Sequence, residues 1–183
     1  MSKAASRAIP VPARVSAQEL ADAMGRDVTE VQAVLTAREE PDAPEDILSS
    51  SLARAVARTL GFDVAVEARD LALEHLYIYE SIGDVQDDPG GRAGRIVTGV
   101  LADLDGLDAE IESASEHWGV ARMPVIDRNV LRIGLYELQN HPETPTGVIV
   151  AEAVRMARTY STEKSGSFVN GVLATLARIV REM

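Results

Sequence analysis

Two arginines and a tyrosine at helical spacing are the residues best placed for binding chemistry. Arg128, Arg132 and Tyr136 follow one another at intervals of four, so a helix over this segment places them on one face. Arginine contacts phosphate through a fork of N–H donors, and an aromatic ring stacks on an unpaired base. The pattern therefore indicates contact with single-stranded nucleic acid. The alternative is that both arginines form surface ion pairs with Asp127 or Glu137.

No constellation of residues in the sequence supports catalysis or metal binding. The chain has no cysteine, which excludes disulfides, thiolate nucleophiles and zinc knuckles. His75, His117 and His141 lack a carboxylate or second histidine at the spacing of a helical metal site. Gly90-Gly91 lacks the lysine and Ser/Thr of a phosphate loop, and no serine occupies a nucleophile elbow. We therefore expect a protein that is not an enzyme and that needs no cofactor or metal.

Charge is distributed unevenly along the 183 residues. Lys and Arg number 18 and Asp and Glu 29, and this net charge of −11 argues against phosphate binding by the chain as a whole. Residues 1–67 are net −4 and residues 68–120 net −9, but residues 121–183 are net +2. The arginine pair therefore belongs to the one net-positive segment.

Composition also bears on the class of protein. An apolar fraction of 46% is too high for a disordered chain. No apolar run approaches the roughly 20 residues that cross a bilayer, and the first residues lack the pattern of a signal peptide. We expect a cytoplasmic protein without a membrane partner.

Residues 1–15, which contain two prolines, are predicted to be a flexible tail, and residues 16–67 a small helical docking domain. The expected elements of this domain are a helix opened by the capping box Ser16-Ala-Gln-Glu19, helices over 28–36 and 49–60, a polar loop over 38–46 and a short strand over 62–67.

From residue 68 onward the pattern is almost wholly helical and predicts an all-α bundle of about six helices. The helical stretches lie over residues 68–82, 96–116, 124–139 and 145–160, and in a final helix that includes Phe168 to Val180. We expect a bend near Gly106 and a break at Ser165-Gly166. The helix ending at Gln139 has apolar residues on more than one side, so it is expected to be central.

Three blocks in the second domain carry a family resemblance. They are Trp118-Gly-Val-Ala-Arg122 followed by Ile126-Asp-Arg-Asn-Val-Leu-Arg-Ile-Gly-Leu-Tyr-Glu-Leu138, then Val148-Ile-Val-Ala-Glu-Ala153, and Tyr160-Ser-Thr-Glu-Lys-Ser-Gly-Ser-Phe-Val-Asn-Gly-Val-Leu173. In this order and spacing they closely resemble the NusB family of bacterial transcription antitermination factors. Ala68-Arg-Asp-Leu-Ala-Leu-Glu-His-Leu-Tyr77 looks like the first helix of that family. The resemblance covers residues 68–183 and implies an all-α fold of two three-helix bundles.

The resemblance implies a function and a set of site residues. The family binds single-stranded boxA RNA of ribosomal RNA operons together with the ribosomal protein NusE, and helps the elongating RNA polymerase resist termination. The residues that match RNA-side positions are Arg69, Arg128, Arg132, Phe168 and Asn170. Tyr77 and Asp127 match positions that face NusE. Gly171 is interpreted as a packing glycine, because a glycine inside a helix costs about 1 kcal/mol relative to alanine.

The chain departs from the family pattern in ways that concern RNA affinity. Family members begin this domain with a run of arginines, whereas Ala65, Val66, Glu67 and Ala68 precede Arg69 here. Each phosphate that is no longer neutralised reduces the log–log salt slope by about 0.7 for a single strand, so we expect weaker and less salt-sensitive binding. The segment over residues 82–93 is also shorter than in the family, which usually has a short helix there.

The N-terminal part has a second resemblance. Ile9-Pro-Val-Pro, Val15-Ser-Ala-Gln-Glu-Leu-Ala-Asp-Ala-Met-Gly25, Glu30-Val31 and Leu60-Gly-Phe-Asp-Val-Ala-Val66 look like the small amino-terminal domain of bacterial translation initiation factor two. A repressor-type helix-turn-helix fits nearly as well. However, its recognition helix over residues 28–36 would contain no Arg or Lys. We therefore favour a docking module over a DNA reader.

These observations predict a NusB-like antitermination factor with an extra N-terminal domain. The first alternative is an adaptor that keeps the fold but has lost boxA binding, and the second is a DNA-binding regulator that uses the N-terminal domain. A third alternative, the RNA-recognition half of a ribosomal RNA methyltransferase, would need a further catalytic domain.

Overall fold

The computed structural model describes most of the chain in two compact units. The described residues are 9–12, 14–38, 47–62, 64–84, 88–115 and 118–181. The units are Met1–Leu71 and Ala72–Met183, and the division falls within one helix. His117 and residues 39–46, most of the predicted polar loop, lie outside the described residues. The domain boundary at residue 68 stays a prediction.

Within its described residues, the first unit contains three complete helices before α4 (Ala68–Ile82), as predicted. They are α1 (Ala17–Met24), α2 (Val28–Ala37) and α3 (Ser50–Thr59). The capping box of α1 is confirmed, because the Ser16 hydroxyl accepts from the Glu19 amide at 3.1 Å and the Glu19 carboxylate accepts from the Ser16 amide at 2.8 Å. Gly25, with a φ of 64°, ends α1 in the left-handed conformation.

The described part of the first unit also contains two small sheets of two strands each. Strand β1 (Ile9–Val11) pairs in parallel with β4 (Val64–Val66), and β2 (Val15–Ser16) pairs antiparallel with β3 (Ile47–Leu48). The strand predicted over residues 62–67 is therefore confirmed in its centre. The prediction of a flexible tail over residues 1–15 is wrong for Ile9–Val11 and Val15, because their backbone groups belong to sheets and Val11 and Val15 are buried.

The second part of the chain is an all-α bundle, as predicted. Its elements are α4 (Ala68–Ile82), α5 (Gly91–Ala102), α6 (Leu104–Ala114), a short 3₁₀ turn η2 (Val120–Arg122), α7 (Val125–Asn140), α8 (Thr146–Tyr160) and α9 (Ser165–Arg181). The described part thus contains six helices, in agreement with the predicted number of about six, and the one long stretch predicted over residues 96–116 corresponds to two of them, α5 and α6.

Two predicted interruptions fall elsewhere. The stretch expected to bend near Gly106 breaks at Asp103, where φ is −132°. A Cβ at Gly106 would lie 2.3 Å from the Asp103 carboxylate, so the glycine makes room for this side chain. Ser165-Gly166 does not lie in a break between helices, contrary to the prediction, but belongs to the first turn of α9. A Cβ at Gly166 would lie 2.7 Å from Cγ of Arg158 on α8, so this glycine serves close packing of the two helices.

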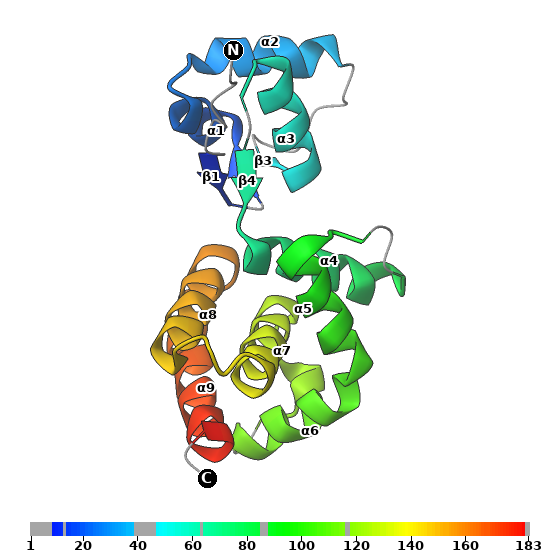
Figure 1. The fold of residues 1–183 in the computed structure, drawn as a ribbon, viewed down its shortest axis with the longest axis vertical. Helices are drawn as coiled ribbons and strands as arrows, with labels where there is room; N and C mark the ends of the chain where they lie inside the picture. The colour runs from blue at the N-terminus through cyan, green and yellow to red at the C-terminus, as the bar shows by residue number, and fades with distance from the viewer. Residues whose placement is uncertain are drawn as a thin grey trace. The chain divides into compact units, whose positions relative to one another are not determined.

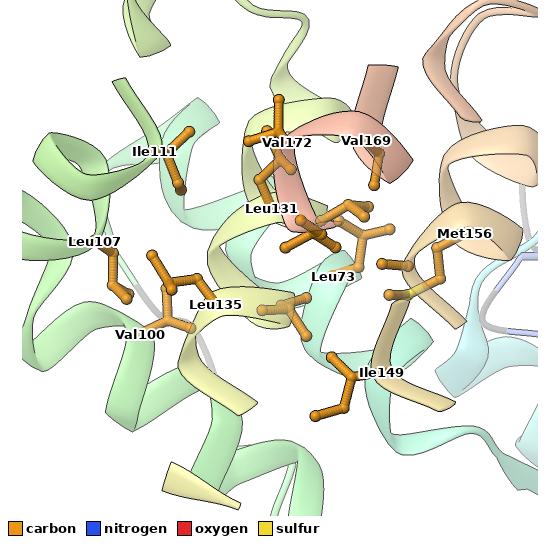
Figure 2. Close-up of a cluster of buried hydrophobic side chains, with 14 of the residues drawn as sticks. Leu73, Val100, Leu107, Ile111, Leu131, Leu135, Ile149, Met156, Val169 and Val172 are labelled. Atoms are coloured by element: carbon orange, nitrogen blue, oxygen red, sulfur yellow. The ribbon is translucent and has the colours of Figure 1, made fainter. Parts of the chain in front are cut away.

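Helix α7 is central, as its broad apolar surface predicts. Figure 1 shows it between the α5–α6 pair and the α8–α9 pair, and it contacts all four helices. Leu131 and Leu135 of α7 lie in the hydrophobic core with Leu107 of α6 and Met156 of α8 (Figure 2), and all four are fully buried. Burial of this size contributes about 1.5–3 kcal/mol for each large aliphatic side chain.

A single arginine holds the end of α7. Arg181 at the end of α9 donates to the backbone carbonyls of Glu137, Leu138, His141 and Thr144, at 2.7 to 3.3 Å. The last carbonyls of a helix lack intrahelical partners and carry partial negative charge. A guanidinium at this place therefore caps α7 and ties its end to α9.

Candidate nucleic-acid interface

The two arginines predicted to contact RNA do share a face of α7, but carboxylates of the same chain occupy that face. Arg128 donates from Nε to both oxygens of Glu80 on α4, at 3.0 and 2.8 Å, and its Nη2 also bonds Glu80. Its Nη1 donates to the Met123 carbonyl at 3.1 Å. Arg128 therefore joins α4 to the start of α7.

Arg132 is held more tightly and is only 6% exposed. Its Nε and Nη2 form a bidentate pair with the Asp108 carboxylate of α6, each at 2.7 Å. Its Nη1 bonds Glu80 and donates to the Asn129 side-chain oxygen at 2.9 Å. The RNA contact predicted for Arg132 is untested, and this geometry does not favour it, because a buried and paired guanidinium cannot reach a phosphate without leaving its partners.

The close ion pairs shift the pKa values of Glu80 and Arg132. Burial raises the pKa of Glu80, but the hydrogen bonds and charges of Arg128 and Arg132 outweigh it and hold that pKa below its usual 4.5. Burial likewise lowers the pKa of Arg132, but the Asp108 and Glu80 carboxylates outweigh it and raise that pKa above its usual value. Both groups stay charged near neutral pH, so the cluster is a network of ion pairs linking α4, α6 and α7.

The ion-pair alternative is right in kind, but the carboxylates that pair with the two arginines are Glu80 and Asp108. The two carboxylates expected from the sequence have other partners. Glu137 bonds Arg92 of α5 at 2.6 Å, and Asp127 accepts from the Ser165 hydroxyl at 2.8 Å.

Asp127 lies at the junction of two helix starts. It is in the first turn of α7 and 3% exposed, and its Ser165 partner opens α9. Its oxygen Oδ2 takes the Ser165 hydrogen bond, whereas Oδ1 has no partner within the part of the chain that the structure describes. Asp127 lines a cavity, through which a partner could reach it.

That cavity, here called the Trp118–Phe168 pocket, has a volume of about 270 Å³. The residues that matter for its chemistry are Trp118, Met123, Pro124, Asp127, Lys164 and Phe168. The Trp118 and Phe168 rings lie 6.5 Å apart between centroids and are tilted by 55°. Trp118 is 56% exposed and Lys164 is exposed. The pocket thus combines two accessible aromatic rings, a cation at its rim and a buried carboxylate.

The remaining predicted residues differ in accessibility. Phe168 is half-buried at the pocket and Asn170 is exposed on the same helix, α9. Tyr77 is 45% exposed on α4. Arg69 is half-buried in the first turn of α4 and interacts with groups of its own chain. The RNA and partner contacts of all these residues stay predictions.

The interpretation of Gly171 as a packing glycine is wrong. The residue is exposed, and a Cβ built on it would meet no atom within 4 Å. A glycine that does permit close approach is Gly134 of α7, where a Cβ would lie 2.8 Å from a Leu173 methyl group of α9. Spacing places both glycines within helices, but it does not tell which faces a neighbour.

Sequence reasoning does not single out two residues of the pocket, Trp118 and Lys164. Trp118 marks the end of a helical stretch in the sequence, and Lys164 lies inside the last motif without a distinguishing pattern. Some 50 residues separate Trp118 from Phe168, so no helical or strand period relates them.

Metal binding and membrane insertion find no support in the described residues. No group of three or more His, Asp or Glu side chains could hold a metal ion in this part of the chain. Among the described helices, none is long and apolar enough to cross a membrane.

Comparison with known proteins finds a family model that matches more than half of the chain. The model of the NusB family matches residues 51–178. A transcription antitermination protein NusB of Sorangium cellulosum is 43% identical, covering 60% of this chain and 88% of the relative, and one of Leifsonia xyli is 35% identical, covering 70% and 92%.

Solved structures agree. NusB of T. maritima superposes with a TM-score of 0.56 at 32% identity, covering 61% of this chain and 88% of the other. A structure of the antitermination factors NusB and NusE in complex with dsRNA superposes with a TM-score of 0.53 at 25% identity, covering 61% and 94%.

Proposed function

The chain belongs to the NusB family, and we propose that it is a transcription antitermination factor that binds boxA RNA of ribosomal RNA operons. In this proposal it binds RNA together with the ribosomal protein NusE, and the complex acts on the elongating RNA polymerase. It is a binding protein and not an enzyme.

The observation that carries the proposal is the Trp118–Phe168 pocket. An exposed Trp118 ring and a half-buried Phe168 ring beside a cation suit the unstacked bases and phosphates of single-stranded RNA. Lys164 and Phe168 belong to the net-positive segment of residues 121–183. The similar solved structures include NusB and NusE in complex with dsRNA, which supports the same choice of partners.

The ion pairs change which residues we propose for the RNA face. We keep Phe168 and Asn170, add Trp118 and Lys164, and keep Arg69 as a contact from the start of α4. Arg128 and Arg132 are proposed to position α4 and α6 on α7 and not to bind phosphate directly. Tyr77 remains the proposed contact with NusE, whereas Asp127, which lines the Trp118–Phe168 pocket and is 3% exposed, is now proposed to serve the RNA face.

We propose that the first unit is a docking module, as its resemblance to the small domain of initiation factor two suggests. A DNA reader is less well supported, since no described residue of α2 is a Lys or Arg. If residues 1–67 are a DNA reader, the full chain will shift duplex DNA at low salt. We expect no such shift.

A second candidate function is a protein adaptor that has lost boxA binding. The acidic total charge and the absence of an arginine run before Arg69 favour it. Titration of labelled boxA RNA and of a scrambled RNA of equal composition separates the two functions.

A charge variant locates the face. Asn170→Asp places a negative charge on the exposed surface of α9, two residues beyond Phe168, and Asn140→Asp makes the same change at the exposed end of α7. We expect Asn170→Asp to weaken boxA binding several-fold and Asn140→Asp to leave it unchanged. Equal effects of the two variants would refute the placement of the RNA face.

A further inference from the structure

One of the residues that line the Trp118–Phe168 pocket is a carboxylate that is only 3% exposed, and one of its oxygens makes no hydrogen bond with the described residues. Asp127 lines the pocket; Oδ2 accepts from Ser165, and Oδ1 makes no hydrogen bond with the described residues. A buried charged oxygen without a donor is costly, and such groups in native proteins call for an explanation. An acceptor with two lone pairs is therefore held ready for a donor that enters the pocket.

The mouth of the pocket selects the shape of the group that enters. The Trp118 and Phe168 rings, 6.5 Å apart and tilted by 55°, offer apolar faces to a flat group. Nucleobases stack on such rings, and so does a guanidinium.

The rim selects by charge. Lys164 is exposed and lines the same pocket as Asp127. Its ammonium group repels an incoming arginine or lysine side chain but attracts the phosphate that accompanies a nucleotide. Shape and charge together therefore favour a nucleotide over a cationic side chain of a protein partner.

The geometry points to a pocket for one unstacked guanine nucleotide, whose base lies against Trp118 and Phe168 and whose N–H donors face Asp127. This inference rests on the proposed RNA binding and deepens it. Guanine alone among the four bases presents two adjacent donors, N1–H and the N2 amino group, on its pairing edge. Adenine and cytosine present a donor next to an acceptor, and the acceptor would face the carboxylate with like charge. Lys164 neutralises the phosphate of the same nucleotide.

The fluorescence of Trp118 tests the inference, because the chain has a single tryptophan. The probes are an oligouridylate dodecamer with one central guanosine and two otherwise identical RNAs with inosine or adenosine in its place. Inosine keeps N1–H but lacks the amino group. We expect quenching of Trp118 by all three probes at low salt, with guanosine bound about tenfold more tightly than adenosine and inosine between them.

Two variants complete the test. Asp127→Asn should abolish the preference for guanosine, and Lys164→Gln should weaken all probes equally and leave the preference intact. Because Asp127→Asn also disturbs the bond to Ser165, the comparison of probes on the unaltered protein is decisive if this variant does not fold.

Three results would overturn the inference. Equal affinity for the three probes, while boxA RNA still binds, would mean that bases stack in the pocket but that the pocket does not distinguish guanine from the other bases. Binding of boxA without any change in Trp118 fluorescence would place the RNA elsewhere. Fluorescence that responds to NusE and not to RNA would assign the pocket to a partner side chain. In each case the proposed function survives, and only the absence of boxA binding itself would remove it.

Discussion

Replacement of Arg132 by alanine separates a structural arginine from an RNA-binding one. The change removes a guanidinium that is 6% exposed and bonded to Asp108, Glu80 and Asn129. Breaking a buried ion pair by deleting one partner costs about 3–5 kcal/mol. In the unaltered protein the Asp108 and Glu80 side chains are 27% and 15% exposed, so water already reaches both carboxylates. Arg128 still neutralises Glu80 when Arg132 is removed. Solvent and Arg128 reduce the cost, so we expect a loss of about 3 kcal/mol in the free energy of unfolding.

The assay is urea unfolding followed by circular dichroism, together with a boxA titration of the folded protein. A loss of this size lowers the melting temperature by roughly 10 °C in a unit of this length. Arg122→Ala is the matched control, because Arg122 is exposed and should change stability by less than about 0.5 kcal/mol. A double-mutant cycle with Asp108→Ala should give a coupling energy of about 1–3 kcal/mol. If the Arg132→Ala protein is as stable as the parent and yet loses RNA binding, the assignment of Arg132 to the ion-pair cluster is refuted.

Further changes test the packing, the cap and the charge cluster. Gly99→Ala places a Cβ 2.1 Å from the Tyr136 ring, so we expect it to reduce the free energy of unfolding in urea by about 1–3 kcal/mol. Gly171→Ala meets no atom and should increase that free energy by up to about 1 kcal/mol, and the reverse order of the two variants would contradict the packing described. Arg181→Ala removes donors to four carbonyls and should cost about 2 kcal/mol, with incomplete rescue by lysine because the fork is absent; full rescue would contradict a role for its shape. Because the folded pKa of Glu80 lies below its unfolded value, its contribution to stability is complete above about pH 4.5 and disappears as pH falls through the folded pKa, so unfolding midpoints between about pH 6 and 3 should fall less steeply for Glu80→Gln.

Short sequence patterns predict the helices well, because the capping residues and the spacing of apolar residues lie within each helix itself. Ser16 with Glu19 and the spacing of apolar residues in α4 and α7 mark elements that the structure confirms. The parallel pairing of β1 with β4 is beyond such signals, because it joins residues more than 50 positions apart and neither three-residue strand has a strong pattern. The break at Asp103 escapes prediction for a related reason, since the glycine at 106 is the stronger local signal.

The candidate site is predictable only in part. The four-residue spacing of Arg128 and Arg132 correctly places them on one face. Their partners Glu80 and Asp108 come from α4 and α6, and the periodicity of one helix cannot predict partners on other helices. Phe168 is identified through its motif. Its neighbour Trp118 and the orientation of Asp127 depend on tertiary packing of α7 and α9.

The central claim is tested most directly by the affinity of the full chain for boxA RNA with and without NusE. The account predicts that boxA binds more tightly than a scrambled RNA, and that NusE increases this affinity about tenfold or more because the chain itself carries a net charge of −11. Affinity for boxA that stays equal to that for scrambled RNA, even with NusE present, would contradict the account.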